Sequence, residues 1–291
     1  MSNRVVKVAG VPEHFNLPWH LAKEQGQFER AGIDLQWTDY PGGTGAMANA
    51  LNTGEADLAI VLTEGIIADI IKGGNSRIVQ VYVRSPLVWG IHVSAHSTYQ
   101  RIQDIKGKKY AISRLGSGSH LMAYVDAAQR GWKLSEDQMV IVNNLDGAVT
   151  ALSEGKADVF MWEKFTTKPL VDSGIFRRID ECPTPWSCFV IAASNNFINA
   201  QPELLNQILK IIRASCEEFM HTREAKDLII KRYGLKPEDA EAWYQQTKWA
   251  TDEIVFERDI EEAVDTLFKL NLIPGRKKAS ELCDVNFCSL L

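Results

Sequence analysis

The chain has 291 residues, of which 45% are hydrophobic and 24% are charged, and its formal net charge is −5. This length is enough for two domains of ordinary size, and the composition is that of a globular protein. Because the charge is small and evenly spread, the sequence argues against nucleic acid as a partner. No apolar run approaches the roughly 18 to 20 residues of a membrane span, so we expect no membrane-spanning segment.

The amino terminus and the cysteines bear on the cellular compartment. Residues 1–4 lead directly into a predicted strand, without the basic-then-apolar leader of a secreted protein or a lipoprotein-type cysteine. We therefore expect a cytoplasmic protein, or a periplasmic one if a leader has been removed. Five cysteines without a C-x-x-C pair are typical of free thiols in a reducing compartment. His92 and His96 lack a third ligand nearby in the sequence, so we expect no metal site.

The predicted elements of the first part alternate between strand and helix. A strand over residues 5–9 is followed by a polar loop at 12–16, a helix over 18–23 and a second strand over 33–37. Residues 50–61, with the sequence ALNTGEADLAIV, then indicate the end of a helix, a glycine turn and a short buried strand.

The second part repeats this order of elements. A strand is predicted over residues 109–113, a polar loop over 114–119, a helix from His120 onward and a strand over 139–142. Residues 151–162, with the sequence ALSEGKADVFMW, then repeat the motif of the first part. This repetition indicates that the chain contains two copies of one structural plan, as duplication would produce.

The duplicated plan predicts an α/β fold of two lobes with mostly parallel sheets, since strands separated by helices pair in parallel through right-handed crossovers. We place lobe one at residues 1–88 and lobe two at 89–188. Residues 189–291 begin with a strand and continue as helices, so we expect them to return to lobe one. Two segments then cross between the lobes as a hinge. A ligand cleft is expected between the lobes, at the carboxyl ends of the strands.

Motifs along nearly the whole chain resemble those of a known family. The two-lobe plan is similar to the type II periplasmic-binding-protein fold, and residues 18–26, 41–43 and the repeated motif resemble its sulfonate-binding and thiamine-pyrimidine-binding branch. A closer resemblance is to a leaderless subfamily found in fungi and bacteria. Its marks here are residues 12–15 (PEHF), 63–64 (TE), 85–89 (SPLVW), 113–119 (SRLGSGS), 161–163 (MWE) and 184–187 (TPWS). The resemblance implies a solute-binding fold that works without an export signal.

The loop at residues 113–119 is a candidate for binding an anionic group. Its glycines allow a close approach of the backbone, and its N–H groups precede a helix, whose dipole favours negative charge. Arg114 adds a cation for charge-assisted pairing. The alternative is a tight turn with Ser119 as the helix N-cap. The glycine loop at 41–45 is its counterpart in lobe one, with a flexible turn as the alternative.

Carboxylates and tryptophans near strand ends favour a planar, nitrogen-bearing ligand. Glu13, Glu64 and Glu163 each follow a predicted strand, and carboxylates pair with ring amino groups. Four tryptophans lie in the same loops or near the hinge, where they could stack on a planar ring, with core packing as the alternative. Trp243 and Trp249 are expected to be packing or surface residues. The candidate ligand-binding residues are Glu13, His14, Trp19, Gly42, Gly43, Thr44, Thr63, Glu64, Trp89, Ser113, Arg114, Gly116, Ser117, Gly118, Ser119, Trp162, Glu163 and Trp186.

These residues favour a non-catalytic protein that closes its lobes on a small molecule such as a thiamine-precursor pyrimidine, with an anionic group at one end. One alternative is the sulfonate-type substrate-binding component of an ABC transporter, with a permease as partner if the protein is exported. Another is an enzyme like thiamine-pyrimidine synthase. The resemblance implies a dense run of cysteines for that enzyme; here Cys188 stands alone, and we predict no catalytic residue and no cofactor. A third alternative is a cytosolic sensor, although no sustained heptad supports a dimer face.

Overall fold

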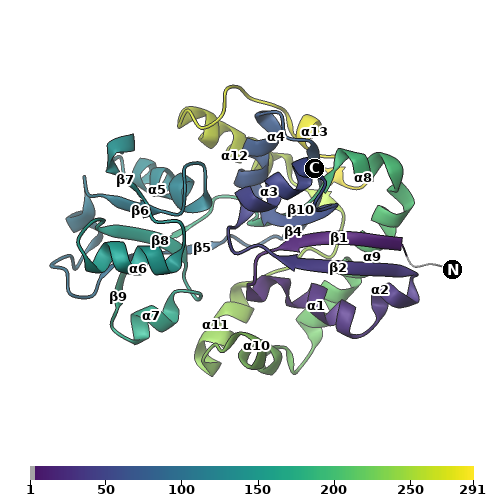
Figure 1. Ribbon diagram of the computed structural model, residues 1–291, viewed down its shortest axis with the longest axis horizontal. Coiled ribbons are helices and arrows are strands. Elements are labelled where there is room, and N and C mark those ends of the chain that lie inside the picture. The colour runs from purple at the N-terminus through teal and green to yellow at the C-terminus, as the bar shows by residue number, and fades with distance from the viewer. Residues whose placement is uncertain (1–3) are drawn as a thin grey trace. The chain divides into compact units, whose positions relative to one another are not determined.

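The computed structural model describes residues 4–291, which form two compact units (Figure 1). Unit 1 contains the residues up to Pro86 and those from Pro185 onward, and unit 2 is Leu87–Thr184. The chain therefore leaves unit 1 once and returns to it. Within residues 4–291, no helix is both long and apolar enough to cross a membrane.

Unit 1 is built around a five-stranded sheet. Its strands lie in the order β2 (Ile33–Asp39), β1 (Arg4–Gly10), β3 (Leu58–Leu62), β10 (Phe189–Ser194) and β4 (Ser76–Val83). Strand β1 pairs in parallel with β2 and β3, whereas β10 runs antiparallel to its neighbours β3 and β4. The segment that returns to unit 1 thus supplies an interior strand of its sheet, so the two parts of unit 1 complete one sheet together.

The helices of unit 1 come from both of its parts. The amino-terminal part contributes α1 (Leu17–Glu24), α2 (Gln27–Arg30), α3 (Thr44–Thr53) and α4 (Thr63–Ile71), after the short 3-10 turn His14–Asn16. The carboxyl-terminal part contributes α8 (Asn195–Ala200), α9 (Pro202–His221), α10 (Ala225–Tyr233), α11 (Pro237–Gln246), α12 (Glu257–Lys269) and α13 (Ala279–Leu282). Its short strands β11 (Ile254–Val255) and β12 (Ser289–Leu290) pair in parallel. This tail therefore begins with a strand and continues as helices, as expected from the sequence.

Unit 2 repeats the arrangement with a second five-stranded sheet. Its strands lie in the order β7 (Met139–Ile141), β6 (Tyr110–Ile112), β8 (Val159–Glu163), β5 (Val88–Ser94) and β9 (Phe176–Pro183). Strand β6 is parallel to β7 and β8, and β5 is antiparallel to β8 and β9. The helices are α5 (Gly118–Gln129), α6 (Leu145–Ser153) and α7 (Lys168–Asp172), with 3-10 turns at Ile102–Ile105 and Glu136–Gln138. The predicted two-lobed α/β fold with mostly parallel sheets is confirmed.

The repeated motif forms the same turn in both units. Its glycine has a φ of 78° in the first copy and 68° in the second, a left-handed conformation that favours glycine. Asp57 N donates to Lys7 O (2.9 Å), and Asp57 Oδ2 accepts from Lys7 N (2.8 Å). Asp158 makes the same two contacts with Lys109, at 2.8 and 3.0 Å. Each aspartate thus fixes the start of its strand against the neighbouring parallel strand.

In each sheet the parallel strands end at one edge, and the antiparallel strand begins at that edge. In unit 1, Phe189 of β10 pairs with Leu62 at the end of β3 and with Val83 at the end of β4. In unit 2, Trp89 of β5 pairs with Glu163 at the end of β8. We call these the carboxyl edges of the two sheets. They position the loops that carry the predicted ligand-binding residues.

Candidate functional site

The carboxyl edge of unit 1 gathers predicted site residues from four segments. Three of these segments, which include the first residues of α3 and α4, follow β1, β2 and β3, and the fourth precedes β10. The predicted residues in them are Glu13, His14, Gly42, Gly43, Thr44, Thr63, Glu64 and Trp186. Trp19 lies apart, because it is fully buried in α1 and packs against Phe28 and Tyr82 in the core of the unit. For Trp19 this environment favours the core-packing alternative.

Glu64 is a fully buried carboxyl group in the first turn of α4. Its Oε2 accepts a hydrogen bond of 2.8 Å from Trp186 Nε1, whereas its buried Oε1 has no hydrogen-bond partner among residues 4–291. Burial raises the pKa of Glu64 to about 7, against the opposing effect of hydrogen bonds from its own backbone and from Trp186. The carboxyl group is therefore close to its titration midpoint at neutral pH and retains an unused acceptor.

The threonines at this edge are engaged within the protein. Thr63 Oγ1 donates to Ser187 O (2.5 Å), and Leu62 N donates to Thr44 Oγ1 (3.0 Å). Helices α3 and α4 approach closely here, since a Cβ added at Gly65 would lie 2.5 Å from Thr44 Cγ2. These hydroxyl groups hold the loops in place, so their predicted contact with a ligand would have to compete with these bonds.

An aromatic cluster surrounds His14. The imidazole stacks on the ring of Trp243 at a centroid distance of 4.3 Å and an interplanar angle of 9°, and Phe15 contacts Phe189. Burial lowers the pKa of His14 to about 3, so the ring is neutral at physiological pH. Trp249 Nε1 and Tyr82 Oη both donate to Phe15 O, at 3.0 and 2.7 Å. The loop after β1 is therefore held both by β4 and by residues of the carboxyl-terminal part.

Sequence reasoning missed the contribution of this carboxyl-terminal part to the edge. Trp243 fits the expected packing role, but its partner is a predicted site residue, His14. Asp259 was not singled out, yet its Oδ2 accepts from Ser187 Oγ (2.7 Å) and N (3.2 Å), beside Trp186. An acidic residue in the first turn of a predicted helix was the available signal, and it is too common to indicate a site.

The serine loop of unit 2 follows β6 and begins α5. Ser117 is the N-cap, since His120 N donates to Ser117 Oγ (3.3 Å); the cap is therefore two residues earlier than the alternative prediction of Ser119. Ser119 Oγ instead accepts from Ser113 N (3.0 Å) and lies 3.1 Å from Ser117 Oγ. Gly116 has a φ of 75°, and Gly118 is the first residue of the helix. The hydroxyl groups thus form the turn.

Arg114 is the charged residue of this loop. Its side chain is half-buried, and desolvation lowers its pKa, although a guanidinium remains protonated at neutral pH. The neighbouring Leu115 is 62% exposed. Arg114 is accordingly a cation just before the amino-terminal end of a 12-residue helix.

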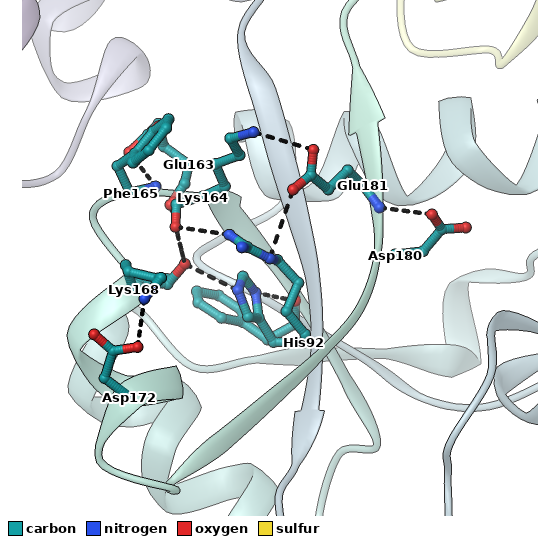
Figure 2. Close-up of polar contacts among 11 residues, drawn as sticks. His92, Glu163, Lys164, Phe165, Lys168, Asp172, Asp180 and Glu181 are labelled. Carbon is teal, nitrogen blue, oxygen red and sulfur yellow. Dashed lines mark hydrogen bonds and ion pairs between the residues drawn. The ribbon is translucent and has the colours of Figure 1, made fainter. Parts of the chain in front are cut away.

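Glu163 lies among polar contacts of unit 2 (Figure 2). Its Oε2 accepts from Phe165 N (3.0 Å), Thr166 N (2.7 Å) and Thr166 Oγ1 (2.9 Å). Burial raises the pKa of Glu163, while these hydrogen bonds lower it. The carboxyl group therefore stabilises the turn that follows β8. Below it, His92 Nε2 lies 2.9 Å from Thr167 Oγ1, and burial lowers the pKa of His92 to about 4.

The two predicted tryptophans of unit 2 contact each other edge to face at 6.4 Å. Trp162 stacks on Phe160 (5.4 Å) and packs against the core around Phe176, which favours the core-packing alternative. Trp89 is 4% exposed, and its buried Nε1 has no hydrogen-bond partner among the described residues. Trp89 thus remains a candidate donor at the carboxyl edge of unit 2.

The two carboxyl edges differ in the chemical groups that they offer. Across residues 4–291, no group of three His, Cys, Asp or Glu side chains is arranged to hold a metal ion. The two edges offer a buried acceptor and aromatic rings in unit 1, and a cation, serine hydroxyls and an indole N–H in unit 2.

Comparisons with known proteins show which chains this one resembles. A family model described as "Ca3427-like PBP" matches residues 89–182. The structure of the Candida albicans CA3427 gene product, which defines a family with the generic periplasmic-binding-protein fold, is 28% identical with a TM-score of 0.88 over 96% of each chain. The alkanesulfonate-binding protein from Xanthomonas axonopodis, solved with MOPS bound, is 16% identical with a TM-score of 0.79 over 100% of each chain.

A relative found by sequence is also a binding protein by name. It is the Bacillus subtilis "Putative aliphatic sulfonates-binding protein", 24% identical over 93% of this chain and 83% of the relative. The resemblance expected from the sequence is therefore confirmed: the chain has the periplasmic-binding-protein fold and is similar to the Ca3427-like proteins and to sulfonate-binding proteins of that fold.

Proposed function

We propose that the chain is a non-catalytic small-molecule-binding protein whose ligand is planar, bears nitrogen and carries an anionic group, as an aminopyrimidine derivative does. The fold supports a solute-binding role, and the relatives with this fold are named as binding proteins. The lobes would close on the ligand, with unit 1 contacting the nitrogen-bearing ring and unit 2 contacting the anionic group.

The observation that carries the proposal is the buried Oε1 of Glu64, which has no partner in the described chain. Leaving a buried acceptor unsatisfied costs about 1 to 3 kcal/mol, and more for a charged group. An N–H group of a ligand, and above all a protonated ring nitrogen, would satisfy this oxygen and favour the ionised form of Glu64. The head group of a sulfonate has only acceptor oxygens and a negative charge, so it lacks this complementarity.

The unit 2 loop supports the anionic part of the proposal. Arg114 and the amino-terminal end of α5 both favour negative charge. The ring of Trp89 lies at the same edge, where its N–H is available as a donor. A ligand with a basic or amino-bearing ring and an acidic substituent would therefore use both edges.

Isothermal titration calorimetry with an aminopyrimidine phosphate tests the proposal. We expect binding that Glu64→Gln weakens by about 10- to 100-fold, because a charge-assisted hydrogen bond contributes about 1.5 to 3 kcal/mol. Glu55→Gln is the matched control, since Glu55 is exposed in the same unit and should leave the affinity unchanged. Absence of binding, or binding that is indifferent to Glu64→Gln, would contradict the proposal.

A sulfonate is the second candidate ligand, because two relatives are named for sulfonate binding and Arg114 offers a cation. The same calorimetry with an alkanesulfonate distinguishes this candidate from the aminopyrimidine-type ligand. A sulfonate that binds through Arg114 should be weakened by Arg114→Gln and unaffected by Glu64→Gln. A permease partner would belong to this candidate, and a cytoplasmic location remains a prediction from the sequence.

A further inference from the structure

A short irregular segment precedes β10 at the carboxyl edge of unit 1. Residues 185–188 begin the return of the chain to unit 1 and form neither helix nor strand. The segment carries Trp186, whose indole N–H donates to Glu64 Oε2 (2.8 Å). Because no helical or strand ladder fixes these residues, their position depends on the partners of their own polar groups.

The polar groups of Ser187 are all bonded within unit 1. Its N–H and Oγ both donate to Asp259 Oδ2, at 3.2 and 2.7 Å, and its carbonyl oxygen accepts from Thr63 Oγ1 (2.5 Å). Thr63 and Glu64 begin α4, and Asp259 lies in the first turn of α12. These two helices pack against each other (Figure 1). Ser187 is therefore held between α4 and α12, next to the tryptophan that contacts Glu64.

Asp259 is a strong anchor for Ser187. Its side chain is only 17% exposed, and hydrogen bonds to an ionised acceptor are about twice as strong as those between neutral groups. The amino-terminal end of α12 also favours a negative charge at this position. Asp259 Oδ1 lies 3.6 Å from Arg258 Nε, but the Arg258 side chain is 82% exposed, so this ion pair contributes little. The carboxylate therefore acts mainly on Ser187.

We propose that Asp259 is a positioning residue of the ligand site, which holds Ser187 so that the indole N–H of Trp186 reaches Glu64. This role depends on the proposed function, in which Glu64 Oε1 accepts from the ligand. Trp186 binds the other oxygen, Oε2, and thereby orients the carboxyl group. Without the Asp259 carboxylate, Ser187 loses the acceptor of two hydrogen bonds, and Trp186 is held less firmly against Glu64.

Hydrogen exchange of the Trp186 indole N–H, followed by NMR of the full-length protein, tests this position without a ligand. The resonance is assigned by its loss in Trp186→Phe. We expect Asp259→Ala to speed its exchange by about 10-fold or more, because hydrogen bonds to a charged group are lost. Trp249, whose buried Nε1 donates to Phe15 O (3.0 Å) in the same unit, should exchange as in the wild type. Unchanged exchange of Trp186, or equal acceleration at Trp186 and Trp249, would overturn the proposal.

Three further variants define the contact. Glu257→Ala is the matched control, because it removes an exposed acidic side chain from the same turn of α12 and should leave the exchange of Trp186 unchanged. Asp259→Asn should restore most of the protection, since both hydrogen bonds from Ser187 end on one oxygen that an amide can replace. Ser187→Ala removes only the Oγ donor and should give a smaller acceleration. If Asp259→Ala does not fold, unchanged exchange in Ser187→Ala overturns the proposal.

Calorimetry with the aminopyrimidine phosphate then connects this position to the ligand. We expect Asp259→Ala to weaken binding by about 3- to 10-fold, less than Glu64→Gln, because Asp259 acts through Trp186. Wild-type affinity in Asp259→Ala, beside accelerated exchange of Trp186, would overturn its role in the ligand site. A wild-type protein that does not bind the compound would contradict the proposed function, whereas the exchange of Trp186 would still decide whether Asp259 positions it.

Discussion

Glu64 and Glu163 follow the two copies of one repeated motif, yet their side chains have different hydrogen-bond environments. Glu64 lies seven residues after Asp57, within the first turn of α4, whereas Glu163 lies five residues after Asp158, as the last residue of β8. The repeat therefore fixes the same turn and strand in both units and leaves the residues beyond the strand free to diverge.

The divergence separates a structural carboxyl group from one with an unused acceptor. Glu163 Oε2 accepts three hydrogen bonds from the turn at residues 165–166. Glu64 accepts from Trp186, while its Oε1 stays unsatisfied among the described residues. A duplicated fold can thus satisfy the carboxyl group with local hydrogen bonds in one copy and leave one of its oxygens unsatisfied in the other.

The largest expected effect comes from removing the structural carboxyl group. Glu163→Ala leaves two backbone N–H groups and a hydroxyl without their acceptor, so we expect a loss of about 2 to 4 kcal/mol in the free energy of unfolding. Urea unfolding followed by circular dichroism measures it. Glu181→Ala is the control, because its ion pair with Lys164 (3.2 Å) is partly exposed and contributes under about 1 kcal/mol. Equal losses of unfolding free energy in Glu163→Ala and Glu181→Ala would show that Glu163 has no special structural role.

The second prediction concerns the pH dependence that Glu64 gives to stability. Its pKa is about 7 in the folded protein against 4.5 unfolded, so the folded state binds more protons between these values. Stability contributed by protonated Glu64 is present below pH 4.5 and lost as the pH rises towards 7, by about 3 kcal/mol. Glu64→Gln should abolish this slope.

Comparing the pH dependence of stability in Glu64→Gln and in the wild type separates the contribution of Glu64 from that of other titratable groups. His14, His20 and His92 have lowered pKa values, so their contribution has the opposite sign and is lost as the pH falls below 6.5. Urea unfolding at about pH 5 and pH 8 should give a smaller pH-dependent loss for Glu64→Gln than for the wild type. Parallel pH profiles would show that Glu64 ionises normally in the folded protein.

The sequence predicts the backbone of both edges well, because the signals for it are local. The periodicity of the strands, the glycine turn and the aspartate that follows it lie within a dozen residues, and each forms as expected in both units. The same signals place Glu64 and Glu163 close to the carboxyl edges.

The sequence does not distinguish the two carboxyl groups, because their partners come from packing. The donor to Glu64 is Trp186, 122 residues away, and Trp243 of the distant tail stacks on His14. The donors to Glu163 are two and three residues away, but only the fold of the turn directs them to the carboxylate. Which oxygen remains unsatisfied is thus decided by tertiary contacts.

The third prediction concerns the two aspartates of the repeated motif, which make the same backbone hydrogen bonds in both units. Asp57 accepts from the backbone N–H of Lys7 within β1 (2.8 Å), and Asp158 accepts from that of Lys109 just before β6 (3.0 Å). We expect Asp57→Ala and Asp158→Ala each to lower the free energy of unfolding by about 1 to 2 kcal/mol. Urea unfolding measures both. A large loss of unfolding free energy in only one of the two variants would show that the two copies of the motif differ in how much their aspartates stabilise the fold.

The smallest expected effect comes from a side-chain contact that Asp158 makes and Asp57 does not, among the described residues. Tyr99 Oη donates to Asp158 Oδ1 (2.9 Å), whereas no such bond is found for Asp57 among residues 4–291. Tyr99→Phe keeps the ring over which Lys108 lies and removes the donor, so we expect a loss of about 0.5 to 1 kcal/mol. In the Asp158→Ala background the same substitution should have no further effect, since its acceptor is gone. An additive loss in this double-mutant cycle would place the role of Tyr99 in packing and would leave the two aspartates equivalent.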